Sequence, residues 1–247
     1  MQTAEHHDIF ISSNDELVRR RADGSYLVSI DSIHMQDALE GGYALALVEF
    51  ICMNTVYPIN EYYNKLYITE NGGGVQEITL PKGNYTASQF VGEIQTQLNT
   101  VGSNTYNVTY DSITEKITFS CAPDTFAFVS GNNSAYSRMG ISVFVPENTS
   151  YTTDSPIDLS GTKHIDIVTN LMIKNYTTTS IPITERVPVP EFFNEQITFF
   201  PEHLAFRKLN LHHLHYFEIR LYDDNHKPFK LAPNTNLFMK WRYLRSI

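Results

Sequence analysis

The residues whose types and spacing could bind a metal ion are a group of histidines near the carboxyl terminus. His212, His213 and His215 lie close together, His203 precedes them, and His213 and His215 would share one face of a strand. A zinc site needs three or four His, Cys or carboxylate ligands, and no acidic residue or cysteine accompanies these histidines at ligand spacing. We therefore predict strand or interface histidines and no metal site, although imidazoles that gain charge near a pKa of about 6.5 could loosen an assembly in acid.

Two further sequence motifs contain residues that can bind metal ions. His164-Ile165-Asp166, taken with His203 or His213, is the nearest approach to the ligand set of a double-stranded β-helix enzyme, and we interpret it as coincidence. Asp223-Asp224-Asn225 has too few oxygen ligands at the spacing of a calcium loop, so a solvated hairpin turn is predicted there.

No pattern indicates catalysis. Cys52 and Cys121 lie in strand-like runs, as buried thiols of a reducing compartment do, and neither has an adjacent motif that would make it a nucleophile. The carboxylates show no arrangement that acid–base chemistry requires. We predict no enzyme, no catalytic residue and no cofactor.

Arg19, Arg20 and Arg21 form the candidate interaction site. Asp15, Glu16 and Asp23 flank them, and the whole chain has 18 Lys and Arg against 27 Asp and Glu, a formal charge of −9. Such a charge opposes sequence-independent binding to nucleic acid. Contact with a packaged genome or an inner membrane stays open, but we favour a contact between subunits or a solvated arm, and no sequence-specific nucleic acid partner.

The elements that must position these residues are mostly strands. Three runs have period two, with every second residue on one face of a strand: Ile165, Ile167, Thr169, Leu171 and Ile173; Phe217, Ile219 and Leu221; and Leu237, Met239, Trp241 and Tyr243. The run 43–57 is apolar on both faces, as in a strand between two covering layers. Many short strands with almost no helix favour a mainly β chain folded as a single jelly roll, a Greek-key sandwich of two sheets, with a closed barrel as the alternative.

One helix interrupts the strands. Pro81 and Gly83-Asn84 end a strand, Thr86 and Gln89 have the spacing of a capping box, and Phe90, Val91, Ile94 and Leu98 then share one face. A hairpin is predicted over 106–121. The segment 75–145 is thus a strand, helix and hairpin that are either inserted in a loop of the jelly roll or part of its elaboration.

The polar amino terminus is interpreted as an arm over 1–24, and the jelly roll as 25–247. No apolar run approaches the roughly 20 residues that cross a bilayer, and the first residues do not have the pattern of a signal peptide. We expect a protein that is not secreted by a signal peptide.

Several of these segments together resemble a known family. They are Leu80-Pro81-Lys82-Gly83-Asn84-Tyr85-Thr86 with its helix, the hairpin, Ser137-Arg138-Met139-Gly140-Ile141, and the terminal strands 216–224 and 237–241. This pattern is similar to that of the minor capsid (penton) proteins of polinton-like viruses, virophages and related large DNA viruses. The chain departs from it at Met139 and Ile141, where the family pattern has leucine and phenylalanine.

The resemblance implies a virion protein of the adenovirus and tectivirus lineage, assembled inside the host cell. It implies a single jelly roll that forms homopentamers at the five-fold vertices of an icosahedral capsid, beside the major capsid protein. The arm would reach neighbouring subunits or an inner layer. The alternative is a receptor- or glycan-binding spike or fibre module on the same sandwich, with exposed aromatic residues such as Tyr151 or Phe192-Phe193 on loop tips.

Overall fold

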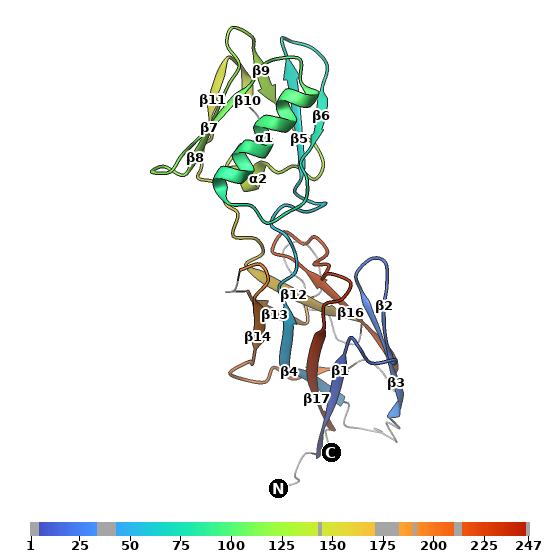
Figure 1. Ribbon diagram of the computed structural model, residues 1–247. Helices are drawn as coiled ribbons and strands as arrows, with labels where there is room; N and C mark the ends of the chain where they lie inside the picture. Colours follow the sequence, from blue (N-terminus) through green and yellow to red (C-terminus); the bar gives the residue numbers. More distant parts are fainter. Residues whose placement is uncertain are drawn as a thin grey trace. The chain divides into compact units, whose positions relative to one another are not determined.

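The chain folds into two compact units, each with its own hydrophobic core. The structure, a computed structural model, describes residues 5–33, 43–142, 145–170, 183–189, 192–209 and 214–245. Unit 1 combines residues 1–56 with 162–247, and unit 2 is the intervening segment 57–161. Unit 2 is therefore inserted between two strands of unit 1 (Figure 1).

Unit 1 is a sandwich of two antiparallel sheets. The first sheet has the order β1-β17-β4-β14, with β15 also paired to β4, and the second has the order β13-β12-β16-β3-β2. The strands of the first sheet are β1 (Glu5–Ser12), β17 (Leu237–Arg245), β4 (Tyr43–Met53), β14 (Gln196–Phe199) and β15 (Arg207–Lys208). Those of the second are β13 (Glu185–Pro188), β12 (His164–Thr169), β16 (Leu214–Tyr222), β3 (Tyr26–Ile33) and β2 (Val18–Arg20).

Period-two alternation places one face of each sheet in a shared core. Phe217, Ile219 and Leu221 of β16 point inward together with Met239 and Trp241 of β17. The consecutive strands β3 and β4 lie in different sheets, and each pairs with a strand from the end of the chain, β3 with β16 and β4 with β17. The predicted jelly-roll sandwich is confirmed, and the barrel alternative does not apply, because the strands form separate sheets.

In the segment 1–24, for which an amino-terminal arm is predicted, the described residues include two paired strands. β1 pairs with β17 from Glu5↔Arg245 to Ser12↔Phe238, and β2 pairs with β3. Ile11 and Val18 are buried in the core of unit 1. Both segments are strands because each pairs with another strand, and the partner of β1 lies at the far end of the chain, where no local sequence pattern indicates it.

Unit 2 contains two smaller sheets and both described helices. One sheet has the order β10-β9-β5-β6 and the other the order β11-β8-β7. The strands are β5 (Lys65–Glu70), β6 (Gln76–Thr79), β7 (Asn107–Asp111), β8 (Lys116–Ser120), β9 (Phe126–Phe128), β10 (Val145–Asn148) and β11 (Ser150–Thr152), and the helices are α1 (Ala87–Val101) and α2 (Tyr136–Met139). The predicted helix and the β7–β8 hairpin are confirmed.

Local chemistry explains where both helices begin or end. The Thr86 side chain accepts from the Gln89 N–H and the Gln89 side chain accepts from the Thr86 N–H, which completes the capping box of α1. α2 ends at Gly140, whose φ of 73° is left-handed, and a Cβ there would lie 2.0 Å from the Ser155 carbonyl oxygen. Only glycine fits at position 140, where it ends α2 within the segment 137–141.

The segment 75–145, for which a strand, helix and hairpin are predicted, lies within the larger compact unit 2. The compact unit runs from Tyr57 to Gly161 and includes β5 as well as β11. Its core is continuous from Ile59 and Leu66 to Ile141 and Val145. None of the described helices is long and apolar enough to span a membrane.

Candidate functional site

The three arginines of the predicted interaction site have different environments. Arg20 donates to the carbonyl oxygens of Leu231 and Ala232, the latter at 2.8 Å, and its guanidinium lies 5.9 Å from the centre of the Tyr26 ring. Arg19, the neighbouring residue, is exposed, and no partner for it is found in the described part of the chain. The hydrogen bonds of Arg20 therefore link β2 to the segment that precedes β17. The exposed Arg19 side chain could contact a partner.

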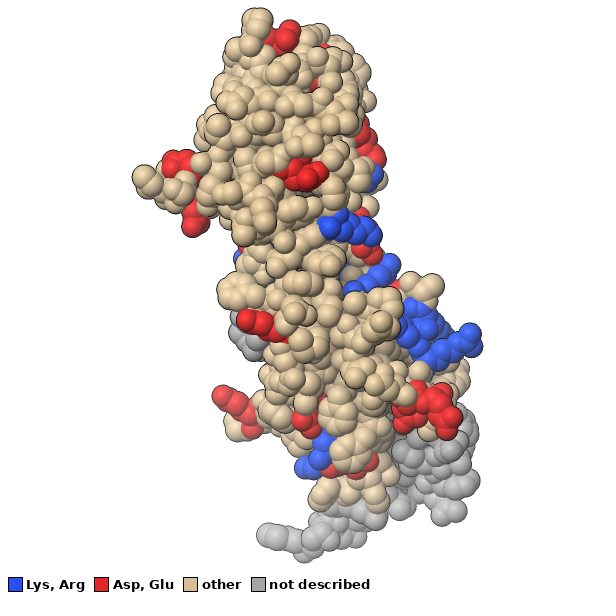
Figure 2. Space-filling model, viewed as in Figure 1, with Lys and Arg blue, Asp and Glu red and all other residues tan. Residues whose placement is uncertain are grey.

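Arg21 belongs to a layer of charges on the outer face of the β13-β12-β16-β3-β2 sheet. It donates to Glu218 at 2.9 Å, and Arg220 donates to the same carboxylate oxygen at 3.1 Å. The Glu218 side chain is 18% exposed, whereas those of Arg21 and Arg220 are 44% and 47% exposed. Figure 2 shows Lys and Arg side chains gathered over β2 and the turn that follows it. The guanidinium groups, rather than the carboxylate beneath them, face solvent here.

The same layer continues across the sheet to Asp166 and Arg186. Arg186 donates to both carboxylate oxygens of Asp166, at 2.7 and 2.9 Å. The Asp166 side chain is 0% exposed and that of Arg186 is 51% exposed. The hydrogen bonds that Arg186 donates to Asp166 raise the pKa of Arg186 above its ordinary value, against the effect of partial burial.

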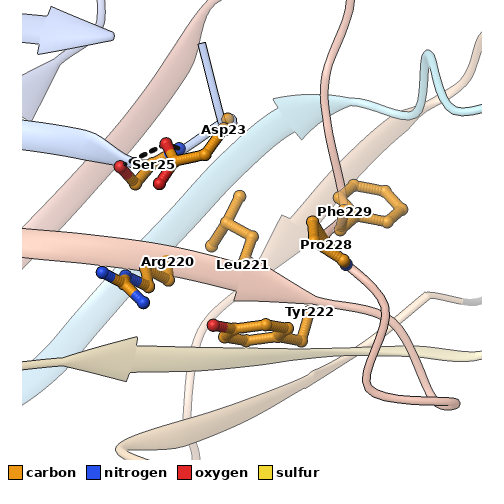
Figure 3. Close-up of a pocket in the computed structure, with 8 residues that line it drawn as sticks. Asp23, Ser25, Arg220, Leu221, Tyr222, Pro228 and Phe229 are labelled. Carbon is orange, nitrogen blue, oxygen red and sulfur yellow. Dashed lines mark hydrogen bonds between the residues drawn. The ribbon is translucent and has the colours of Figure 1, made fainter. Parts of the chain in front are cut away.

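A small hollow lies beside this layer, where the pairing of β3 with β16 ends (Figure 3). It has a volume of about 170 Å³ and is lined by the β2–β3 turn, the end of β16 and Pro228-Phe229. Asp23 at its rim accepts from the Ser25 hydroxyl at 2.7 Å, which lowers the pKa of the Asp23 carboxyl. Ligand pockets are typically about 300–1,000 Å³, so the hollow is too small to indicate a cofactor or substrate.

The predicted metal-site candidates do not come together in the described residues. His212 and His213 lie outside them, the His215 side chain is likewise not described, and His203 is exposed. No group of three His, Cys, Asp or Glu side chains in the described ranges could hold a metal ion. His164 and Asp166 do lie close together, but the Asp166 carboxylate forms a salt bridge with Arg186.

The Asp223 side chain closes the acidic turn by accepting hydrogen bonds from backbone N–H groups of the same turn. One Asp223 carboxylate oxygen accepts from the N–H groups of Asn225 and Lys227, at 2.9 and 2.7 Å. This is the geometry of a side chain that closes a turn, in keeping with the hairpin turn predicted from the sequence.

Both cysteines are free and buried. Burial raises the pKa of Cys52 to about 12. A thiol with so high a pKa carries almost no thiolate at neutral pH and is a poor nucleophile.

Among the described residues of unit 1, four aromatic side chains are more than half exposed, and one of them, Phe192, belongs to the Phe192-Phe193 pair noted in the sequence. They are Phe10 at 62%, Phe192 at 68%, Phe200 at 60% and Tyr216 at 61% exposed. Large exposed rings on a folded domain commonly mark surfaces that bind a partner. Tyr151, the other aromatic residue expected on a loop tip, is half-buried in unit 2, where its ring packs against Phe128 and its hydroxyl donates to Asp154.

Comparison with solved structures finds proteins of similar fold. No protein-family model matches the sequence, and no curated protein matches it. A crystal structure of the selenomethionine-labelled mavirus penton protein is similar over 100% of both chains, with a TM-score of 0.53 and 14% sequence identity. The likeness spans both units, so the chain and that protein share their whole fold.

Proposed function

We propose that this chain is a structural virion protein that forms the pentameric capsomer at the five-fold vertices of an icosahedral capsid. The observation that carries the proposal is the structural likeness to a penton protein over the full length of both chains. A sandwich alone occurs in many unrelated proteins, but the same sandwich with an inserted second unit is a more specific architecture.

The surface of unit 1 supports a role in assembly. Rings of identical subunits are held by heterologous contacts, in which one patch of a subunit meets a different patch of the next. Permanent interfaces bury aromatic side chains and arginines. The exposed rings of Phe10, Phe192 and Phe200, together with the outward guanidinium groups of Arg19 and Arg21, are of this kind.

The partners that follow are other copies of the chain and the major capsid protein, and the location is the capsid of the virion. The protein then acts by geometry and carries out no reaction. Because β1 and β2 belong to the two sheets, contacts with neighbouring subunits or an inner layer would come from the folded sandwich, and not from an extended arm over 1–24.

A receptor- or glycan-binding spike is the second candidate. One observation favours it, the exposure of Phe192 at 68% beside the turn that precedes β14. Spikes and fibres are commonly trimeric, so oligomeric state separates the two functions.

The test is the native mass of the purified chain, with class averages from negative-stain micrographs. We expect a closed ring of five copies. A stable trimer would favour the spike. A monomer that also fails to join shells formed by the major capsid protein on co-expression would contradict the vertex function.

A further inference from the structure

Asp166 is a buried carboxylate with three basic side chains around it. Arg186 on the edge strand β13 binds both of its oxygens, at 2.7 and 2.9 Å. His164 Nε2 lies 3.8 Å and His226 Nδ1 lies 4.0 Å from Asp166 Oδ2. A carboxylate that is 0% exposed depends on its neighbours to balance its charge.

The fold brings the two histidines to this carboxylate by separate routes. His164 and Asp166 are two residues apart on β12, so both point to the outer face of the sheet. Asp166 pairs with Tyr222, the last residue of β16, and the turn after β16 brings His226 back over β12. His226 has a left-handed φ of 59°, and its N–H donates to the Asp223 carbonyl at 2.9 Å, which fixes its place in the turn.

In this arrangement, how firmly β13 is held by Asp166 depends on the charge of the His164 and His226 imidazoles. With both imidazoles neutral, Arg186 provides the positive charge that is hydrogen-bonded to Asp166. When they gain protons, two more cations lie about 4 Å from the same carboxylate, where they share its attraction and repel Arg186. Arg186 is half-exposed and can move into water, whereas His164 and His226 are held by β12 and the turn.

We propose that Asp166, Arg186, His164 and His226 form an acid latch, which holds the edge strand β13 on its sheet at neutral pH and loosens it in acid. The inference concerns the sandwich itself and does not depend on the proposed function.

Other ionisable side chains surround the acid latch, but none of those named here is an imidazole, the group that ordinarily titrates between about pH 5.5 and pH 7.5. Tyr222 and Arg220 lie on β16, Glu185 on β13, Lys163 before β12, and Asp223, Asp224 and Lys227 in the turn. Carboxyl, phenol, ammonium and guanidinium groups ordinarily titrate well outside the interval from about pH 5.5 to pH 7.5, and imidazole titrates within it. Imidazole is therefore the class of side chain whose charge changes in this interval.

The test compares the effect of Arg186→Gln on unfolding at about pH 7.5 and about pH 5.5, which bracket the ordinary imidazole pKa. Trp241 is the single tryptophan of the chain and is buried in unit 1, so its fluorescence in urea follows that unit alone. Arg186→Gln increases the unfolding equilibrium constant at neutral pH. We expect that increase to be about tenfold smaller in acid, because protonated histidines already oppose Arg186 there.

The matched background is the double variant His164→Gln, His226→Gln. In it, the effect of Arg186→Gln should be the same at both pH values. Equal pH dependence with and without the histidines, or a larger effect of Arg186→Gln in acid, would overturn the acid latch.

A measurement on the unmodified chain keeps the inference testable if Arg186→Gln does not fold. Hydrogen exchange of the β13 amides, corrected for the intrinsic pH effect, should show about tenfold more frequent opening at the lower pH. β14, the edge strand of the other sheet, is the internal control and should not change relative to the core. Unchanged opening of β13 would exclude the acid latch.

Discussion

At the scale of single residues, adjacent arginines of one sequence run have different roles. Replacement of Arg20 by Ala removes donors to the carbonyl groups of Leu231 and Ala232, and hydrogen bonds from charged groups contribute about 1.5–3 kcal/mol. We expect a loss of about 2 kcal/mol in the free energy of unfolding of unit 1, measured by urea with Trp241 fluorescence. Arg19→Ala is the control and should change it by less than about 0.5 kcal/mol. A loss for Arg20→Ala that is no larger than the loss for Arg19→Ala would contradict the structural role of Arg20.

Glu70 is the buried carboxylate of unit 2, and its stabilising effect depends on pH. Burial by itself would raise its pKa, but hydrogen bonds from the Ser103 and Asn104 N–H groups, the Tyr106 hydroxyl and Gln76 outweigh this and lower it. A folded pKa below the ordinary value of 4.5 means that the ionised form stabilises the fold above that pH, and that this stability is lost as the pH falls through the folded pKa.

The test of this network is Glu70→Gln. We expect a loss of about 1–3 kcal/mol at neutral pH, followed through the helical circular dichroism of α1 during thermal unfolding. The difference from the unmodified chain should shrink as the pH falls below about 4.5. Glu115→Gln, at an exposed turn position, should cause little change. A difference that stays constant down to low pH would contradict this account of Glu70.

At the scale of elements, the start of α1 depends on one side chain. Thr86→Ala removes the acceptor for the Gln89 N–H, which typically costs about 1 kcal/mol. Thermal unfolding followed by the helical signal should show a lower midpoint. Thr100→Ala, in the exposed last turn of the same helix, should have less than half this effect. The same midpoint for both variants would mean that the cap does not stabilise the helix.

The elements that could be predicted from the sequence are those whose determinants are local. The capping pair Thr86 and Gln89 predicts where α1 begins, and a short turn joins β7 to β8. The sequence of β1 suggests part of an arm, because its partner β17 starts at Leu237 and no neighbouring residue indicates that pairing. Pairings between distant strands are set by tertiary packing, which local periodicity does not encode.

The candidate site was harder to predict for the same reason. The run from Arg19 to Arg21 suggests a single patch, yet Arg20 reaches the segment before β17 and Arg21 reaches Glu218 on β16. Asp166 occupies an outward position of a strand that the sequence predicts, but Arg186 lies in β13, for which the sequence analysis predicts no strand, so their pairing is visible only in the structure.

At the scale of the whole molecule, unit 2 should fold without unit 1. Its core is separate, and its two ends lie close together, since a Cβ placed on Gly161 would be 3.7 Å from Pro58 Cγ. We expect a fragment of residues 57–161 to unfold cooperatively on heating and to keep the circular dichroism of α1. A fragment of 75–145, the narrower range predicted from the sequence, lacks β5 and β11 and should not fold. Cooperative unfolding of the narrower fragment alone would contradict these limits.

We propose that this chain occupies the vertices of a capsid. The most direct test is an icosahedral reconstruction of particles assembled with the major capsid protein, in the presence and in the absence of this chain. We predict density for five copies around each five-fold axis, into which both units fit, and empty vertices when the chain is omitted. Occupied vertices without the chain, or density for it only as trimers elsewhere on the shell, would contradict the account.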